Sequence, residues 1–225
     1  MDPTARLRAL LDAGADDFAL DDAALLIAAH EHPDLDIQAR RAMLDDLART
    51  VPEPTFEALL STLFGPGGFT GNAQDYYDPE NSFLDSVLDR RVGIPILLAV
   101  LAIEVGRRCD VGVVGIGMPG HFLVRSAQHP QVFADPFSGA TVLHADDCRA
   151  LFRSISGGGV RWDDRYLAPS SKLDIVIRVL ANLKAIYQQR NDYLRLGRVM
   201  RMRSVVPAIA DQERDERFRL MAPMN

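Results

Sequence analysis

The residues best suited to chemistry are a histidine and an aspartate in the middle of the chain, His121 and Asp135. His121 follows a Pro-Gly turn at the start of one expected β-strand, and Asp135 ends the next one. Two adjacent strands can bring an imidazole and a carboxylate within hydrogen-bond reach, which fixes the histidine tautomer and raises its basicity. Such a pair can act as a general base. Each residue also has a structural interpretation, because both lie in good turn sequences.

A metal site in this region would recruit the same two residues together with His144. However, the sequence lacks the dense spacing of histidine, cysteine and carboxylate residues that metal sites use. We therefore expect neither a metal ion nor a cofactor.

The chain has two cysteines, Cys109 and Cys148, which are too few for a disulfide framework. This cysteine usage favours a reducing cytoplasm. Cys148 follows Asp146 and Asp147 directly, and neighbouring carboxylates raise the pKa of a thiol rather than lower it. The sequence therefore offers no evident thiol nucleophile.

A long apolar helix is expected to lie at the centre of the fold. It opens at Gly93-Ile94-Pro95 and continues over residues 96–107, apolar almost all round, so it must be covered on most sides. At ~1.5 Å per residue, Cys109 lies about twenty ångströms from Pro95. Beyond Cys109, short β-branched or alternating segments separated by turns predict an antiparallel sheet, with strands at 111–116, 121–125, 131–134 and 140–143.

Helices are expected on both sides of this α+β core. Residues 1–70 contain three helical patterns and a closing Gly-Pro-Gly-Gly, which predict an N-terminal helical subdomain. Asp78 and Pro79 are expected to cap and open a further helix. The core is expected over residues 71–168. The remaining segment, 169–225, is expected to be a helical tail packed on the core, with helices at 172–189 and 192–204.

The charge of the chain is unevenly distributed. The formal net charge is −6, but residues 1–90 carry 18 acidic and 6 basic residues, whereas residues 172–225 carry 6 acidic and 11 basic residues. A basic end can bind nucleic acid, here through Arg195, Arg198, Arg201 and Arg203. No matching aromatic residues interleave these arginines, and the protein as a whole is acidic. We therefore favour contact between the two ends over nucleic-acid binding.

No segment predicts insertion into a membrane or secretion. The longest apolar run, residues 92–103, is too short to span a bilayer. The N-terminus begins Met-Asp-Pro and soon becomes acidic, unlike a secretory signal. The expectation is a cytoplasmic protein without a membrane partner.

Short motifs follow one another in a distinctive order along the chain: NSFL at 81–84, RVGIP at 91–95, PGHF at 119–122 and ADPF at 134–137. Their order and spacing resemble the transglutaminase-like superfamily, which has a papain-like fold, and its bacterial Sir B-type branch in particular. In the tail, NLKAIY at 182–187, NDY at 191–193 and Pro207 resemble one tetratricopeptide unit, and RD at 214–215 resembles an end motif of the branch. The resemblance extends from about Tyr76 to Arg217.

The resemblance implies that His121 and Asp135 occupy two positions of a Cys-His-Asp triad. In active members the cysteine lies at the N-terminus of the central helix, where the helix dipole and the imidazolium stabilise the thiolate. Here Pro95 or a neighbouring isoleucine takes that position, and neither can attack a carbonyl. Just upstream, Tyr76 and Asn81 are expected to line the cleft or, alternatively, to form the core edge and cap a helix.

Three functional hypotheses follow. The first is a pseudoenzyme, a regulatory protein that binds another protein or peptide through the residual cleft or the tetratricopeptide-like tail. The second is a hydrolase of altered chemistry, in which His121, oriented by Asp135, activates water. The third is nucleic-acid binding. We favour the first, because loss of the nucleophile from a comparable triad lowers turnover roughly a millionfold.

Overall fold

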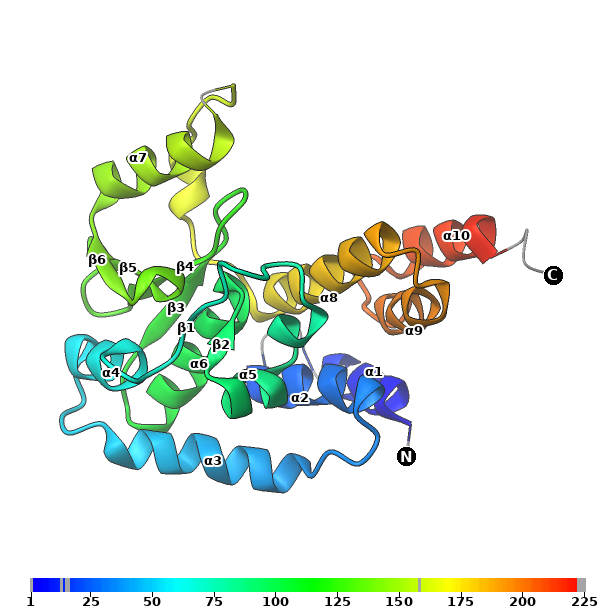
Figure 1. Cartoon of the computed structure of the whole chain (residues 1–225), viewed down its shortest axis with the longest axis horizontal. Coiled ribbons are helices and arrows are strands. Elements are labelled where there is room, and N and C mark those ends of the chain that lie inside the picture. The colour runs from blue at the N-terminus through cyan, green and yellow to red at the C-terminus, as the bar shows by residue number, and fades with distance from the viewer. Residues whose placement is uncertain (1, 13, 15–16, 158, 222–225) are drawn as a thin grey trace.

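The computed structural model describes residues 2–12, 14, 17–157 and 159–221. The first part of the chain is helical and wraps around the lower side of the molecule in Figure 1. Its apolar faces enter one core, and Asp36 and Thr55 cap two of its helices through their side chains. The helices are α1 (Pro3–Asp12), α2 (Leu20–Glu31), α3 (Ile37–Thr50) and α4 (Phe56–Phe64).

The central helix predicted from the sequence is α6 (Pro95–Arg108). It contacts helices on several sides and also the first two strands of the sheet, so its all-round apolar surface is covered as expected. The sheet has four antiparallel strands in sequential order: β3 (Val113–Ile116), β4 (Leu123–Ser126), β5 (Phe133–Asp135) and β6 (Thr141–Leu143). Hairpin connections give this order directly.

The two faces of the sheet belong to different apolar clusters. Val124 and Ala134 face the main core with α6, whereas Leu123 and Phe133 face a smaller cluster. The smaller cluster is completed by α7 (Ala145–Ser156) and η3 (Asp164–Leu167). Alternation along each strand therefore sends neighbouring residues to opposite layers.

Two short features between α4 and α6 differ from the sequence prediction. The helix expected after Asp78 is divided, because Phe83 has an extended backbone that separates η1 (Pro79–Ser82) from α5 (Leu84–Arg90). Asp78 caps η1 as predicted. A parallel pair that was not predicted joins β1 (Thr70–Gly71) to β2 (Val92–Gly93). Strands of two residues are too short to show a periodic pattern.

The C-terminal part consists of α8 (Lys172–Gln189), α9 (Tyr193–Arg203) and α10 (Ala210–Met221), which extend to one side of the molecule (Figure 1). The first two lie where the sequence places helices, and they pack against each other. The RD motif at 214–215 lies in α10, and the side chain of Arg214 is outside the described part. The main cluster of buried hydrophobic residues extends from Leu7 to Val206, so all three predicted segments contribute to it. The predicted boundaries between the segments stay a prediction.

The acidic and basic ends of the chain meet in the structure. Glu31 of α2 forms ion pairs with Arg195 and Arg198 of α9. Within the tail, Glu213 pairs with Arg203 and Lys184. Part of the charge asymmetry is therefore compensated internally. Among the described residues, no helix is long and apolar enough to cross a membrane.

Candidate functional site

His121 and Asp135 lie side by side in the structure. The Nε2 atom of His121 is 2.9 Å from the Oδ1 atom of Asp135, and both residues are buried. Asp135 is the last residue of β5, as predicted. His121 differs from the prediction, because β4 begins at Leu123 and His121 lies in the preceding turn, where its N–H donates to the carbonyl of Met118.

The contact between the two side chains has the length of a hydrogen bond but not its alignment. Nε2 of His121 forms no well-directed hydrogen bond with any described group, so the predicted hydrogen bond is present only as a close ionic contact. The carboxylate of Asp135 is fixed independently. Its Oδ1 accepts from the N–H of Phe137 at 3.0 Å and its Oδ2 accepts from the hydroxyl of Ser138 at 2.9 Å.

An aromatic layer connects the buried pair to the surface. The ring of Phe137 meets His121 edge-to-face at 6.0 Å between centroids and meets Tyr76 at 5.9 Å. Tyr76 is 37% exposed, and burial of its ring edge raises the pKa of the phenol. Tyr77, packed against Tyr76, is 57% exposed. Aromatic side chains therefore lie between the buried imidazole and the surface.

The small parallel pair brings this layer to the start of the central helix. Gly71 pairs with Gly93, two residues before Pro95. A Cβ atom on Gly71 would lie 2.4 Å from the ring of Phe137, so glycine is required for this approach. Hence Phe137, whose ring also contacts His121, lies close to the segment that leads into α6.

That end of α6 is apolar. Ile94 precedes the helix without a side-chain cap, Pro95 takes the first position, and both are buried together with Ile96. Proline is comfortable there because the first turn needs no N–H partner within the helix. Nothing at this position can act as a nucleophile.

The two thiols lie elsewhere. Cys109 caps the opposite end of α6, and burial raises its pKa. Cys148 is fully buried in the smaller apolar cluster, where burial and then the Asp147 carboxylate raise the pKa of the thiol to about 11. Both thiols are thus protonated at neutral pH and are poor nucleophiles.

Asn81 supports the loop that carries Tyr76. Its buried amide donates to the carbonyls of Asp75 at 2.7 Å and Tyr76 at 3.3 Å, and its side-chain oxygen accepts from Asn72 at 3.0 Å. Both amide hydrogens are used in this way. Asn81 therefore positions the loop of Tyr76 and is itself fully buried.

His144 lies apart from the pair and caps α7, with its Nδ1 atom 3.1 Å from the carbonyl oxygen of Gln131. Within the described ranges, no three histidine, cysteine or carboxylate side chains are grouped so that they could hold a metal ion. The prediction that the chain uses no metal or cofactor stays a prediction.

Sequence reasoning missed Arg178 of α8. Its Nη2 atom donates to the carbonyls of Met118 at 2.9 Å and His121 at 2.7 Å, and its guanidinium lies over the ring of Phe122. Burial lowers the pKa of this arginine, and no carboxylate pairs with it among the residues that the structure describes. Arg178 therefore holds the turn of His121 from a helix remote in sequence.

The region that contains the central helix and the buried His-Asp pair matches a known family. The profile of the transglutaminase-like superfamily matches residues 29–181. This chain belongs to the transglutaminase-like superfamily. The matched region contains both members of the pair, the central helix, and α8 as far as Arg178 and slightly beyond.

Relatives of this superfamily member occur in bacteria and animals. A UPF0162 protein of Xylella fastidiosa is 37% identical over 207 residues, covering 85% of this chain and 73% of that protein. A UPF0162 protein of Pseudomonas aeruginosa is 31% identical over 184 residues, covering 78% and 67%. The human F-box only protein 21 is 28% identical over 130 residues, covering 53% of this chain and 20% of that protein. No solved structure matches the chain.

Proposed function

We propose that this transglutaminase-like protein is a pseudoenzyme, a regulatory protein that binds another protein or peptide at the cleft beside His121. One observation carries the proposal. The N-terminal end of α6, where the superfamily resemblance implies a catalytic cysteine, holds Ile94, Pro95 and Ile96. Removing the nucleophile from a comparable triad lowers turnover roughly a millionfold, so thiol catalysis is negligible here.

The surroundings of the cleft support recognition of a peptide. Tyr76 and Tyr77 expose aromatic surface next to Phe137 and His121, and such residues contribute strongly to protein interfaces. Arg178 adds a half-buried guanidinium that no described carboxylate neutralises. An extended segment with a polar or acidic group fits this combination of aromatic rim and buried cation.

The α8–α9 pair supports a second contact surface. We interpret it as one tetratricopeptide-like unit that packs on the core, since a single unit cannot form a solenoid. Arg190, at the end of α8, donates to the carbonyl of Tyr77, so the pair adjoins the cleft rim. Tyr193 and Leu194 are exposed at the start of α9, the latter by 70%. Nucleic-acid binding is disfavoured, because Glu31 already pairs with Arg195 and Arg198.

The test is affinity capture from the native cytoplasm, in which the proposal places the protein, followed by a direct binding measurement with the identified partner. Deletion of the tail after Pro169 would expose the main core, because Ile175 and Leu180 are buried in it. Leu194→Ser is therefore the cleaner tail variant. We expect His121→Ala and Tyr76→Ala to weaken binding on the order of tenfold or more. If both variants bound the partner as tightly as the wild type, the proposed binding site beside His121 would be rejected.

A second candidate function is hydrolysis with His121 as the general base. One observation favours it: Nε2 of the imidazole and Oδ1 of Asp135 lie 2.9 Å apart and both residues are buried, so a small change of alignment would let the carboxylate orient the base. Purified protein should be assayed with peptide and ester substrates beside the His121→Ala variant. Turnover that His121→Ala abolishes without lowering the melting temperature would replace the binding proposal. The proposal expects no such turnover.

A further inference from the structure

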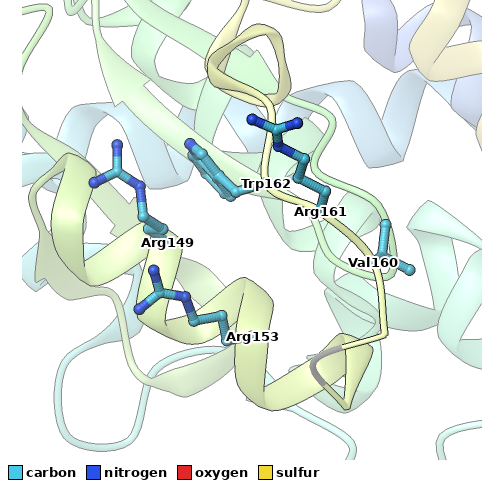
Figure 2. A pocket seen from close by; sticks show the side chains of 5 residues that line it. All are labelled: Arg149, Arg153, Val160, Arg161 and Trp162. Atoms are coloured by element: carbon cyan, nitrogen blue, oxygen red, sulfur yellow. The ribbon is translucent and has the colours of Figure 1, made fainter.

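A basic pocket lies on the opposite side of the sheet from α6, between α7 and the segment that returns from it. It has a volume of about 480 Å³, within the usual range for small-ligand sites. Arg149 and Arg153 project from α7, and Val160, Arg161 and Trp162 come from the returning segment (Figure 2). All five residues line the same pocket.

The charges around this pocket are incompletely balanced. Arg149 is paired, with Asp146 at 2.9 Å and Asp164 at 3.4 Å. Arg153 and Arg161 are exposed, and neither forms an ion pair within the described part of the chain. Arg149 and Arg153 are four residues apart on α7 and therefore share one face, where like charges repel. A protein with a net charge of −6 thus gathers positive charge at one concavity.

The aromatic wall of the pocket is held firmly. The indole N–H of Trp162 donates to Asp164 at 2.7 Å, and the ring packs edge-to-face on Phe152 and Tyr166. The guanidinium of Arg149 lies 5.6 Å from the centroid of the indole. These contacts fix the positions of Trp162 and Arg149 in the wall of the pocket.

We propose that this pocket binds a small ligand that carries phosphate groups. Guanidinium groups match the geometry and charge of phosphate oxygens, and their hydrogen bonds to phosphate are among the stronger ones in proteins. Arg153 and Arg161 supply the free charge, and Arg149 with Trp162 forms the wall beside it. The site lies on α7 and is separate from the His121 cleft.

The sequence provides a reporter for this site. Trp162 is the only tryptophan of the chain, so intrinsic tryptophan fluorescence arises at the pocket alone. Pyrophosphate should be titrated into the full chain at constant ionic strength, with sodium chloride as the matched salt. We expect a saturable change in fluorescence with pyrophosphate and a much smaller, non-saturating change with chloride.

Matched variants separate binding from general charge effects. Arg161→Gln removes one charge at the pocket, whereas Arg165→Gln removes one charge from the same segment, where Arg165 is paired with Asp163 outside the pocket. Arg161→Gln and Arg153→Gln should each weaken pyrophosphate binding on the order of tenfold, because each removes one charge-assisted hydrogen bond. Arg165→Gln should bind like the wild type.

Three results would overturn the proposal: no saturable signal with pyrophosphate, an equal signal with chloride, or equal weakening by Arg161→Gln and Arg165→Gln. Arg153 and Arg161 are both exposed, so folding should be preserved in these variants. Circular dichroism of each variant checks this point.

Discussion

The two ends of α6 differ sharply in chemistry. At its N-terminal end, Ile94 and Pro95 are buried and apolar, and the pair of His121 and Asp135 comes from a turn and from the end of β5. At its C-terminal end, Glu104 is fully buried and pairs with Arg107 at 2.8 Å and with Arg108 at 3.0 Å. Basic residues there also suit the negative end of the helix dipole.

The difference indicates where this protein uses buried charge. The C-terminal network extends through Arg108 to Asp21 of α2 and Asp45 of α3, so it joins three helices. Glu104 also accepts from the N–H of Leu20 at 2.7 Å. Charge at this end anchors the helix, whereas the N-terminal end of α6 holds apolar residues and no ion pair among the described residues. The comparison predicts that stability depends on one end and recognition on the other.

The largest effect is expected at the C-terminal end. Glu104→Ala should lower the free energy of unfolding by about 3–5 kcal/mol, because it removes one carboxylate partner of the largely buried Arg108 and leaves the N–H of Leu20 without its acceptor. Denaturant unfolding measures this change. The exposed pair Arg49–Asp46 is the control, and Arg49→Ala should cost no more than about 1 kcal/mol. If Glu104→Ala and Arg49→Ala lowered the free energy of unfolding equally, Glu104 would not anchor the helix.

A smaller loss is expected at the N-terminal end. Asp135→Asn should lower the free energy of unfolding by about 1–3 kcal/mol, because a neutral amide replaces the buried carboxylate that accepts from Phe137 and Ser138. Ser138→Ala removes only one of these hydrogen bonds and should cost less. If Asp135→Asn were the more stable protein, the carboxylate would be retained for recognition or chemistry at the expense of stability.

The third effect is a pH dependence. Burial, and then the neighbouring Asp21, hold the pKa of Glu104 above its ordinary value of 4.5. The folded state therefore binds this proton more tightly than the unfolded state. The protonated Glu104 carboxyl therefore adds to the free energy of unfolding below pH 4.5. This contribution is lost as the pH rises through the raised pKa of Glu104. Glu104→Gln should reduce this loss, measured as unfolding free energy against pH; curves parallel to the wild type would show that another group titrates.

The sequence predicts much of the site that local patterns determine. Turn residues and short alternating segments indicate four antiparallel strands, and Asp135 at a strand end follows from them. Arg178 was not predictable in this way, because its contacts with the turn of His121 join residues 57 positions apart. The pairing of Gly71 with Gly93 was missed because two-residue strands leave no periodic signal.

Local and tertiary preferences also conflict at two positions. His121 alternates with Leu123, which predicts a common strand, yet the N–H of His121 is used by the turn at Met118. Phe83 continues a helical pattern, but its extended backbone places it at the start of a new helix. In both cases a local turn, closed by a hydrogen bond to the residue three positions earlier, interrupts the periodic pattern.

The most direct test of the proposed pseudoenzyme function measures partner binding in a variant without cysteine. Cys109→Ser combined with Cys148→Ala removes both thiols, and His121→Ala is then added to the same background. We predict that the cysteine-free protein binds its captured partner with the wild-type Kd. His121→Ala should then weaken binding on the order of tenfold at a nearly unchanged melting temperature. Loss of binding in the folded cysteine-free protein, or full binding after His121→Ala, would contradict the proposed function.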